Sequence, residues 1–167
     1  MVGLIEGIYL AREGGAPVVR VEEFEDLEGC GLQGDRYCSG TGRWSRFERD
    51  CEVTFVEAEH LECIGLETGM RVENGEHRRN IVTRGVSLDD LRRTRFRTGE
   101  AAFGYGKPCS VCRHVERLTK PGMAEALEGR GGMRARVLRG RTFALGRCHP
   151  RLVVAVPNSG APAVKRR

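Results

Sequence analysis

Short runs of alternating apolar and polar residues recur along the chain, and each is typical of a β-strand. The segments GLIEGIYLA and VVRVEEF flank the turn-like REGGAP, which predicts two strands joined by a Gly/Pro loop. Further strands are predicted at CEVTFV, NIVTRGV and RFRTGEAAF, the last being either one strand or a pair that turns at Gly99. MRARVLRG and RTFALG predict a closing hairpin around Gly140.

Three short segments have helical spacing instead. In EAEHLECIGLE the apolar residues Ala58, Leu61 and Ile64 lie three apart, which predicts a short amphipathic helix. SLDDLRR begins with Ser87 and has Asp90 three positions later, the spacing of a capping box. TKPGMAEALEG places a proline in the first helical turn and a glycine at the end.

These elements do not follow a βαβ rhythm, so the fold class predicted is mainly β: a β-barrel with short helical insertions. The chain of 167 residues is long enough for one domain. We assign residues 1–150 to it and expect residues 151–167 to form a C-terminal strand and a partly disordered tail. Residues 29–50 are rich in glycine and charge, which predicts a long loop, and long loops in compact domains are usually functional or mobile.

The net charge of +5 comes almost entirely from arginine, since only Lys107, Lys120 and Lys165 are lysines. Arginine binds carboxylates and phosphates through paired hydrogen bonds, so an arginine-lined pocket would suit an anionic ligand. Aromatic residues make up 6 % of the chain, which weighs against base stacking and a nucleic-acid partner. No stretch is long and apolar enough to predict a membrane span.

Cysteine occurs seven times, at irregular spacing, and this does not predict the disulfide framework of a secreted protein. The start of the chain reads as strands and not as a secretory signal. We therefore expect a cytoplasmic protein with reduced thiols.

The segment PCSVCRHVE places Cys109 and Cys112 three apart, and four interpretations are open. A C-x-x-C pair is half of a structural zinc site, whose other ligands would be His114, Cys148 and His149. A thioredoxin-like redox pair should open a helix in a βαβ unit, and the flanking sequence lacks that context. The two thiols could also be inert and buried, as free cysteines often are.

The fourth interpretation is a reactive sulfur centre. Lys107, Arg113 and His114 lie within two residues of one cysteine or the other, and nearby positive charge lowers a thiol pKa and favours the nucleophilic thiolate. His114 could also assist proton transfer near neutral pH. This interpretation accounts for the cations as well as the cysteines, so we favour it.

Four stretches, GLQGDRYCSGTGRWS, EVTFVEAEHLE, RRNIVTRGVSLDDL and PCSVCRHVE with GGMRARVLRGRTFALG, together resemble the MOSC domain, named for the C-terminal part of molybdenum cofactor sulfurases. The likeness runs from about residue 4 to residue 147 and is strongest to small stand-alone bacterial members. It implies a β-barrel similar to that of pyruvate kinase, with a reactive cysteine beside a basic cleft. Two departures are Tyr37, where the family often has histidine, and Arg147, where it usually has aspartate.

Carried onto this chain, the family motif aligns Cys112 with the reactive cysteine and leaves Cys109 as a neighbouring or resolving thiol. Residues expected to bind the anionic substrate or cofactor are Arg36, Arg78, Arg79, Asn80, Lys107 and Arg113. Asp35, beside Arg36, is expected to tie down backbone amides of the long loop.

The resemblance implies two functions that stay open at this point. In the first, Cys112 carries persulfide sulfur from a pyridoxal-phosphate cysteine desulfurase to an anionic small molecule or pterin, and no cofactor is bound tightly. In the second, the protein binds the molybdenum cofactor with Cys112 as metal ligand. Such a protein could use the cofactor to reduce N-hydroxylated compounds. A zinc-stabilised β domain with a basic nucleic-acid face is a third hypothesis.

Overall fold

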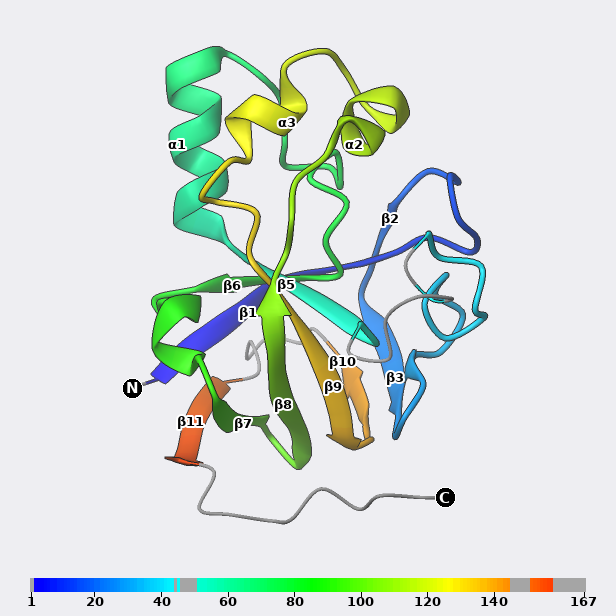
Figure 1. Ribbon diagram of the computed structural model, residues 1–167. Helices are drawn as coiled ribbons and strands as arrows, with labels where there is room; N and C mark the ends of the chain where they lie inside the picture. Colours follow the sequence, from blue (N-terminus) through cyan, green and yellow to red (C-terminus); the bar gives the residue numbers. More distant parts are fainter. Residues whose placement is uncertain (1, 44, 46–50, 145–150, 158–167) are drawn as a thin grey trace.

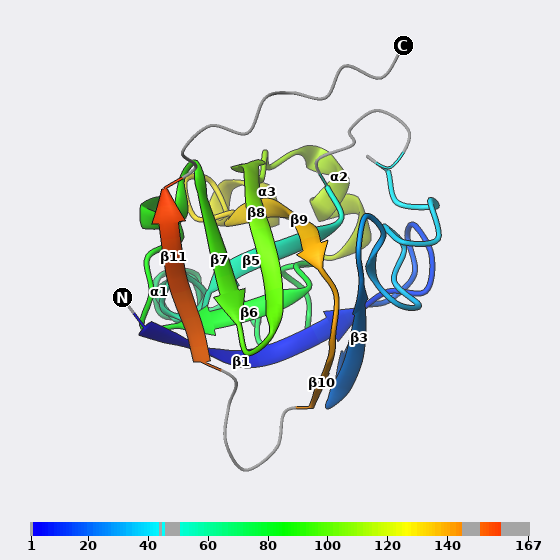
Figure 2. The ribbon, with the colours of Figure 1, turned by 90° about the horizontal axis from the view of Figure 1, so that it is seen from below.

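A computed structural model describes residues 2–43, 45, 51–144 and 151–157 of the chain. In this part, eight strands form one sheet in the order β11-β7-β8-β9-β5-β6-β1-β2, and β1 also pairs with β11. The sheet therefore curls round on itself into a barrel (Figure 2). Its strands are β1 (Val2–Leu10), β2 (Val19–Val21), β5 (Val53–Glu57), β6 (Ile81–Arg84), β7 (Thr94–Thr98), β8 (Ala101–Pro108), β9 (Met133–Arg139) and β11 (Arg151–Pro157).

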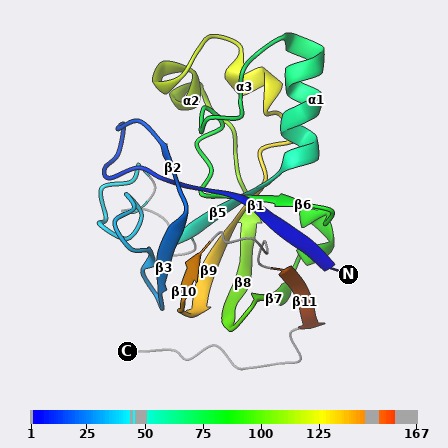
Figure 3. The same cartoon turned by 180° about the vertical axis from the view of Figure 1, so that it is seen from behind.

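A second, smaller sheet lies beside the barrel, in the order β10-β3-β4. It consists of β3 (Glu23–Leu27), β4 (Gly31–Leu32) and β10 (Thr142–Ala144). Seen from behind, β1 crosses the barrel between β6 and β11 (Figure 3). The mainly β barrel predicted from the alternating pattern is confirmed.

Apolar side chains fill the barrel. Phe55, Phe96 and Phe103 are fully buried, and their ring centroids lie 5.3 to 5.5 Å apart. Aromatic pairs at such distances contribute about 0.5–1.5 kcal/mol each beyond the burial of their area. The barrel interior is thus a packed core, and a ligand has to bind outside it.

The helices gather on one side of the barrel, at the top in Figure 1. They are α1 (Ala58–Thr68), α2 (Arg113–Leu118) and α3 (Met123–Ala126). A short 3-10 helix, η1 (Leu88–Leu91), follows β6 in the chain. A second apolar cluster, which includes Leu61, Ile64 and Met123, joins α1 and α3 to the sheet. The helix predicted from Ala58, Leu61 and Ile64 is confirmed as α1.

Two glycines let the chain pass close to its neighbours beneath these helices. Gly132 has a φ of +76°, and a Cβ there would lie 1.9 Å from the carbonyl oxygen of Phe55. A Cβ on Gly131 would lie 2.8 Å from the carbonyl oxygen of Cys109. The segment before β9 is therefore pressed against both β5 and the chain that leaves β8.

Several local predictions were wrong. The strands β9 and β10, on either side of Gly140, do not form the predicted hairpin. Instead β10 pairs with β3, since Gly140 lies against the Asp26 backbone and the Asp26 amide donates to the Arg141 carbonyl at 2.9 Å. Ser87 precedes a 3-10 helix but its side chain makes no cap hydrogen bond. The amide of Leu88 donates instead to Glu57 Oε1 at 2.7 Å.

The expectation of reduced thiols fails for one pair, since Cys30 and Cys38 form a disulfide. No helix in the described residues is long and apolar enough to cross a membrane. A cytoplasmic location stays a prediction. Of the residues placed outside the domain, 151–157 form β11, which pairs with β7 and β1, and 158–167 lie outside the described part of the chain.

Candidate functional site

The site lies where the chain leaves β8 and enters α2. Ser110, Val111 and Cys112 line two pockets at once, one of about 880 Å³ and one of about 330 Å³. Cys112 is half-buried and immediately precedes the first residue of α2. Both volumes are within the range of small-molecule sites, roughly 300–1,000 Å³.

The smaller pocket is basic, and we call it the basic pocket. Its walls include Arg36, Arg43, Arg78 and Arg79, and no carboxylate is among its described lining residues. The four arginines come from the long loop after β4 and from the segment before β6. This loop therefore supplies half of the cations, as its charge and glycine content led us to expect.

Arg36 is fixed by a buried carboxylate. Its Nη1 donates to Asp35 Oδ1 at 3.1 Å and its Nη2 to the carbonyl oxygen of Arg78 at 2.9 Å. Asp35 also accepts hydrogen bonds from the backbone amides of Ala11 and Tyr37. The structure thus supports the predicted role of Asp35 in tying down the loop.

Arg78 and Arg79 are fixed by backbone carbonyls. Arg78 Nη1 donates to Ala16 O at 2.9 Å, and Arg79 donates from Nε to Gly131 O at 2.6 Å and from Nη1 to His77 O at 3.1 Å. Arg78 has a φ of 57°, a backbone region that costs of order 1 kcal/mol or more for a residue other than glycine. The packing around the pocket holds it there.

Neither of these two guanidiniums forms an ion pair with a carboxylate of the described residues, although the charge of Asp35 acts on Arg78. Both residues are only 8 % exposed. Burial, followed by repulsion from Arg36, lowers the pKa of Arg78 to about 10, which leaves it charged at neutral pH. The pocket thus concentrates buried positive charge that an anion could balance, so it is suited to an anionic ligand.

Two histidines near the pocket are neutral at pH 7. Burial, together with the charge of Arg79, lowers the pKa of His77 to about 3, and its Nδ1 accepts the amide hydrogen of Arg79. Burial and the charges of Arg43, Arg117 and Arg78 lower the pKa of His114. His114 lines the basic pocket together with Cys112, and as a neutral imidazole it has a nitrogen able to accept a proton.

The cysteines differ in depth. Cys109 is 8 % exposed, and burial raises its thiol pKa, although Arg79 and Arg36 oppose this. Burial likewise raises the pKa of Cys51 to about 12. Cys112 is the more exposed member of the C-x-x-C pair and lines both pockets, so it is the better placed nucleophile.

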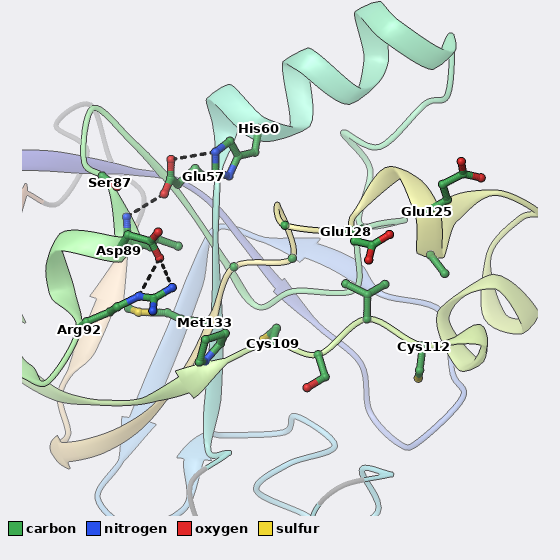
Figure 4. A pocket seen from close by; sticks show the side chains of 18 of the residues that line it. Glu57, His60, Ser87, Asp89, Arg92, Cys109, Cys112, Glu125, Glu128 and Met133 are labelled. Atoms are coloured by element: carbon green, nitrogen blue, oxygen red, sulfur yellow. Dashed lines mark hydrogen bonds and ion pairs between the residues drawn. The ribbon is translucent and has the colours of Figure 1, made fainter.

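The larger pocket has the opposite charge, and we call it the acidic pocket. Figure 4 shows several of its charged side chains around the strand end that carries Cys109. Its carboxylates, arginines and histidine number five, two and one: Glu57, Asp89, Glu116, Glu125, Glu128, Arg92, Arg113 and His60.

Some of these carboxylates already have partners. Glu57 Oε2 lies 3.6 Å from His60 Nε2, and Asp89 Oδ1 lies 3.0 Å from Arg92 Nη2 (Figure 4). Glu116 Oε1 accepts the amide hydrogen of Gly122 at 2.8 Å. Glu125 and Glu128 are exposed and have no ion-pair partner among the described residues.

The structure brings together five of the residues selected from the sequence. Arg36, Arg78, Arg79, Cys112 and His114 all line the basic pocket. Sequence reasoning missed two other lining residues, Tyr37 and Arg43, although both follow Arg36 in the same loop. It did not predict an acidic pocket: Glu57 and Glu116 were considered only as possible partners of arginines, and the other carboxylates come from elements far apart in the chain.

The remaining candidates lie elsewhere. Cys109 and Arg113 line the acidic pocket. Lys107 lies on β8 in register with Arg134 and lines neither pocket. Asn80 is fully buried, where it accepts from the Thr54 amide at 3.2 Å and hydroxyl at 2.8 Å and donates to Tyr9 O at 3.1 Å.

The hydrogen bonds of Asn80 connect three strands or their ends, which gives this residue a structural role. Its side chain does not reach the basic pocket, since it is absent from the lining. The sequence pattern suggested otherwise because Asn80 directly follows two arginines that do line the pocket.

The structure also bears on two interpretations of the C-x-x-C pair. Among the described residues, no group of three or more His, Cys, Asp or Glu side chains could hold a metal ion. Cys148 and His149 lie outside those residues. The strands on either side of the pair, β8 and β9, are antiparallel, so the βαβ context of a thioredoxin-like site is missing.

The β-barrel thus places Cys112 between two pockets of opposite charge. The family model described as the MOSC domain matches residues 42–149. The chain therefore belongs to the MOSC domain family. The resemblance seen in the sequence motifs is confirmed.

Solved structures show the same fold. The YuaD protein from Bacillus subtilis has a TM-score of 0.76 at 18 % identity, covering 92 % of this chain and 96 % of that one. YiiM from Escherichia coli has a TM-score of 0.69 at 19 % identity, covering 96 % and 72 %. YiiM from Geobacillus stearothermophilus has a TM-score of 0.68 at 17 % identity, covering 95 % and 77 %. No curated protein sequence matches the chain.

Proposed function

We propose that this protein carries sulfur as a persulfide on Cys112 and transfers it to an anionic acceptor held in the basic pocket. The observation that carries the proposal is the position of Cys112. It is half-buried and lines the same pocket as three buried arginines and a neutral histidine. Membership of the MOSC domain family agrees with this proposal, since the family is associated with molybdenum cofactor sulfurases.

The loading step is a thiol exchange. The Cys112 thiolate attacks the outer sulfur of a donor persulfide, a new S–S bond forms at Cys112, and the donor's S–S bond breaks. The donor leaves as a thiolate and takes up a proton, while His114 is placed to accept the proton that Cys112 releases. A cysteine desulfurase is the donor we propose.

The unloading step uses the basic pocket. A nucleophilic group of the bound acceptor attacks the outer sulfur of the Cys112 persulfide, and Cys112 leaves as the thiolate. Arg78 and Arg79 would hold the anionic group of the acceptor, a phosphorylated pterin or another small metabolite. Because both guanidiniums are fixed by backbone carbonyls, the acceptor is positioned without reorganisation of the pocket.

Mass spectrometry after incubation with cysteine and a cysteine desulfurase tests the proposal. We expect one added sulfur atom on the Cys112 peptide, absent in Cys112→Ser and retained in Cys109→Ser. Cys63→Ser is the matched control, because Cys63 is an exposed free thiol on α1 that lines neither pocket. If no cysteine gains sulfur while a known acceptor is charged in the same reaction, sulfur carriage is wrong.

A second candidate is binding of the molybdenum cofactor, and the residues fit that group. Cys112 would supply a thiolate ligand, and the arginines of the basic pocket would bind the phosphate of the pterin. When bound, the cofactor would supply two-electron redox chemistry, such as reduction of N-hydroxylated compounds. Molybdenum and pterin analysis of the purified protein, compared with Cys112→Ser, distinguishes this candidate from sulfur carriage.

A further inference from the structure

The two pockets that meet at Cys112 have opposite charge. The basic pocket has four arginines and no carboxylate among its described lining residues, whereas the acidic pocket has five carboxylates against two arginines. The segment Ser110, Val111 and Cys112 is the wall between them. A thiol on this wall can be approached from either side.

The acidic pocket has features beyond its carboxylates. It is the larger of the two, at about 880 Å³, and the thiol-bearing residue Cys109 lies at its inner side (Figure 4). Cys109 is more than nine-tenths buried, and no described group makes a hydrogen bond with its sulfur. A cavity of this size, lined by two cysteines, has the dimensions of a ligand site.

Two of its carboxylates are available to a ligand. Glu57, Asp89 and Glu116 are engaged by His60, Arg92 and the Gly122 amide. Glu125 and Glu128 are exposed, come from α3 and the residues after it, and have no ion-pair partner among the described residues. Carboxylates in a concave surface raise the local concentration of cations.

We propose that the acidic pocket is a second binding site, which takes an ammonium or guanidinium group of the species that exchanges sulfur with Cys112. The anionic acceptor occupies the basic pocket. Donor and acceptor are then bound on opposite sides of one sulfur atom, and neither has to leave before the other arrives. This inference deepens the proposed sulfur carriage and rests on it.

The test uses two small thiol reagents with the same reactive group and opposite charge, the trimethylammonium-ethyl and sulfonatoethyl methanethiosulfonates. In each case the Cys112 thiolate attacks the sulfenyl sulfur, forms the disulfide and expels methanesulfinate. Peptide mass spectrometry follows Cys112 specifically, with the exposed Cys63 as a reference thiol in the same molecule. The readout is the ratio of the cationic to the anionic rate, which cancels any change in the thiol pKa.

We expect the ratio at Cys112 to fall about 16-fold in Glu125→Gln/Glu128→Gln. A unit charge about 8 Å from a reacting thiolate changes the rate of a charged reagent roughly twofold in water, two such charges act together, and the cationic and anionic rates change in opposite directions. Arg78→Gln should raise the ratio, since Arg78 lines the basic pocket. The matched control is Glu23→Gln/Glu25→Gln, which removes the same charge from exposed positions on β3 that line neither pocket.

A ratio within twofold of wild type in the Glu125→Gln/Glu128→Gln variant, or an equal fall in the β3 control, would overturn the second site. Activated disulfide peptides with lysines or glutamates beside the cysteine then identify the source of the cation. Faster reaction of the lysine peptide than of the glutamate peptide indicates that the cationic group belongs to a segment of a partner protein. Equal rates for the two peptides indicate that it belongs to a small molecule. The reagents modify Cys112 whether or not it carries sulfur, so failure here is distinguishable from failure of the sulfur-loading experiment.

Discussion

Asp26 is a buried carboxyl group, and replacing it with asparagine should change how stability depends on pH. The residue lies on β3 and is 2 % exposed. Neither carboxyl oxygen has a hydrogen-bond partner among the described residues. Burial raises the pKa of Asp26 from 3.8 to about 8. The folded protein therefore holds this side chain in the neutral, protonated form at pH 7.

The sign and size of the effect follow from linkage. Between pH 4 and pH 8 the folded state binds this proton and the unfolded state does not, so the free energy of unfolding falls as pH rises through that window. Each unit of pKa difference corresponds to about 1.36 kcal/mol. From a pKa of 3.8 unfolded and about 8 folded, Asp26 alone lowers stability by about 2.5 kcal/mol between pH 5 and pH 7.

Urea unfolding of wild type and Asp26→Asn at pH 5, 6, 7 and 8 measures this contribution. Asparagine does not titrate, so the free energy of unfolding of the variant should not fall over this range. The difference between variant and wild type should therefore shift in favour of the variant by about 2.5 kcal/mol from pH 5 to pH 7. Asp90→Asn, at an exposed position of η1, is the control and should follow wild type. Parallel curves for wild type and Asp26→Asn would refute the argument that desolvation alone controls this group.

Three further predictions concern structural residues. Asn80→Ala should lower the free energy of unfolding by about 3 kcal/mol, because it leaves buried Thr54 and Tyr9 groups without partners, whereas the exposed Asn74→Ala should change it by less than about 0.5 kcal/mol. Reduction of the Cys30–Cys38 disulfide, which has a sequence separation of 8, should lower the free energy of unfolding measured in urea by about 2.5 kcal/mol. An unchanged urea midpoint after verified reduction would contradict this. Gly132→Ala should prevent accumulation of folded protein, judged by soluble yield, because its Cβ would lie 1.9 Å from a backbone oxygen.

The elements that could be predicted from the sequence are those whose pattern is local. The strand predicted at CEVTFV and the helix predicted from the three-residue spacing of α1 were both found where the pattern placed them, although β5 is buried on both faces. The pairing of β10 with β3 could not be predicted in this way. It depends on contact between Gly140 and Asp26, which are more than a hundred residues apart.

The same distinction applies to the candidate site. Lys107 and Arg113 were candidates because they are close to the cysteines in sequence, but neither is among the charges that lower the pKa of Cys109. The charges that oppose the rise in its pKa come from Arg79 and Arg36, at least thirty positions earlier in the chain. Their positions in the long loop and before a predicted strand, supported by the family resemblance, led to these arginines before the structure did.

The two cysteines of the C-x-x-C pair show which effect decides reactivity here. Arg79 and Arg36 both lower the pKa of Cys109, yet burial still raises it above the ordinary value, so desolvation outweighs two nearby cations. Proximity to positive charge is therefore not sufficient for a reactive thiol in this protein; the thiol also needs access to water or ligand. Cys112 lines the basic pocket together with Arg36 and Arg79 and is more exposed than Cys109, which is why the proposal places the carried sulfur there. A variant that buries Cys112, such as Ser110→Leu on the shared wall, should slow its alkylation without removing any charge, and an unchanged rate would show that access is not the controlling factor.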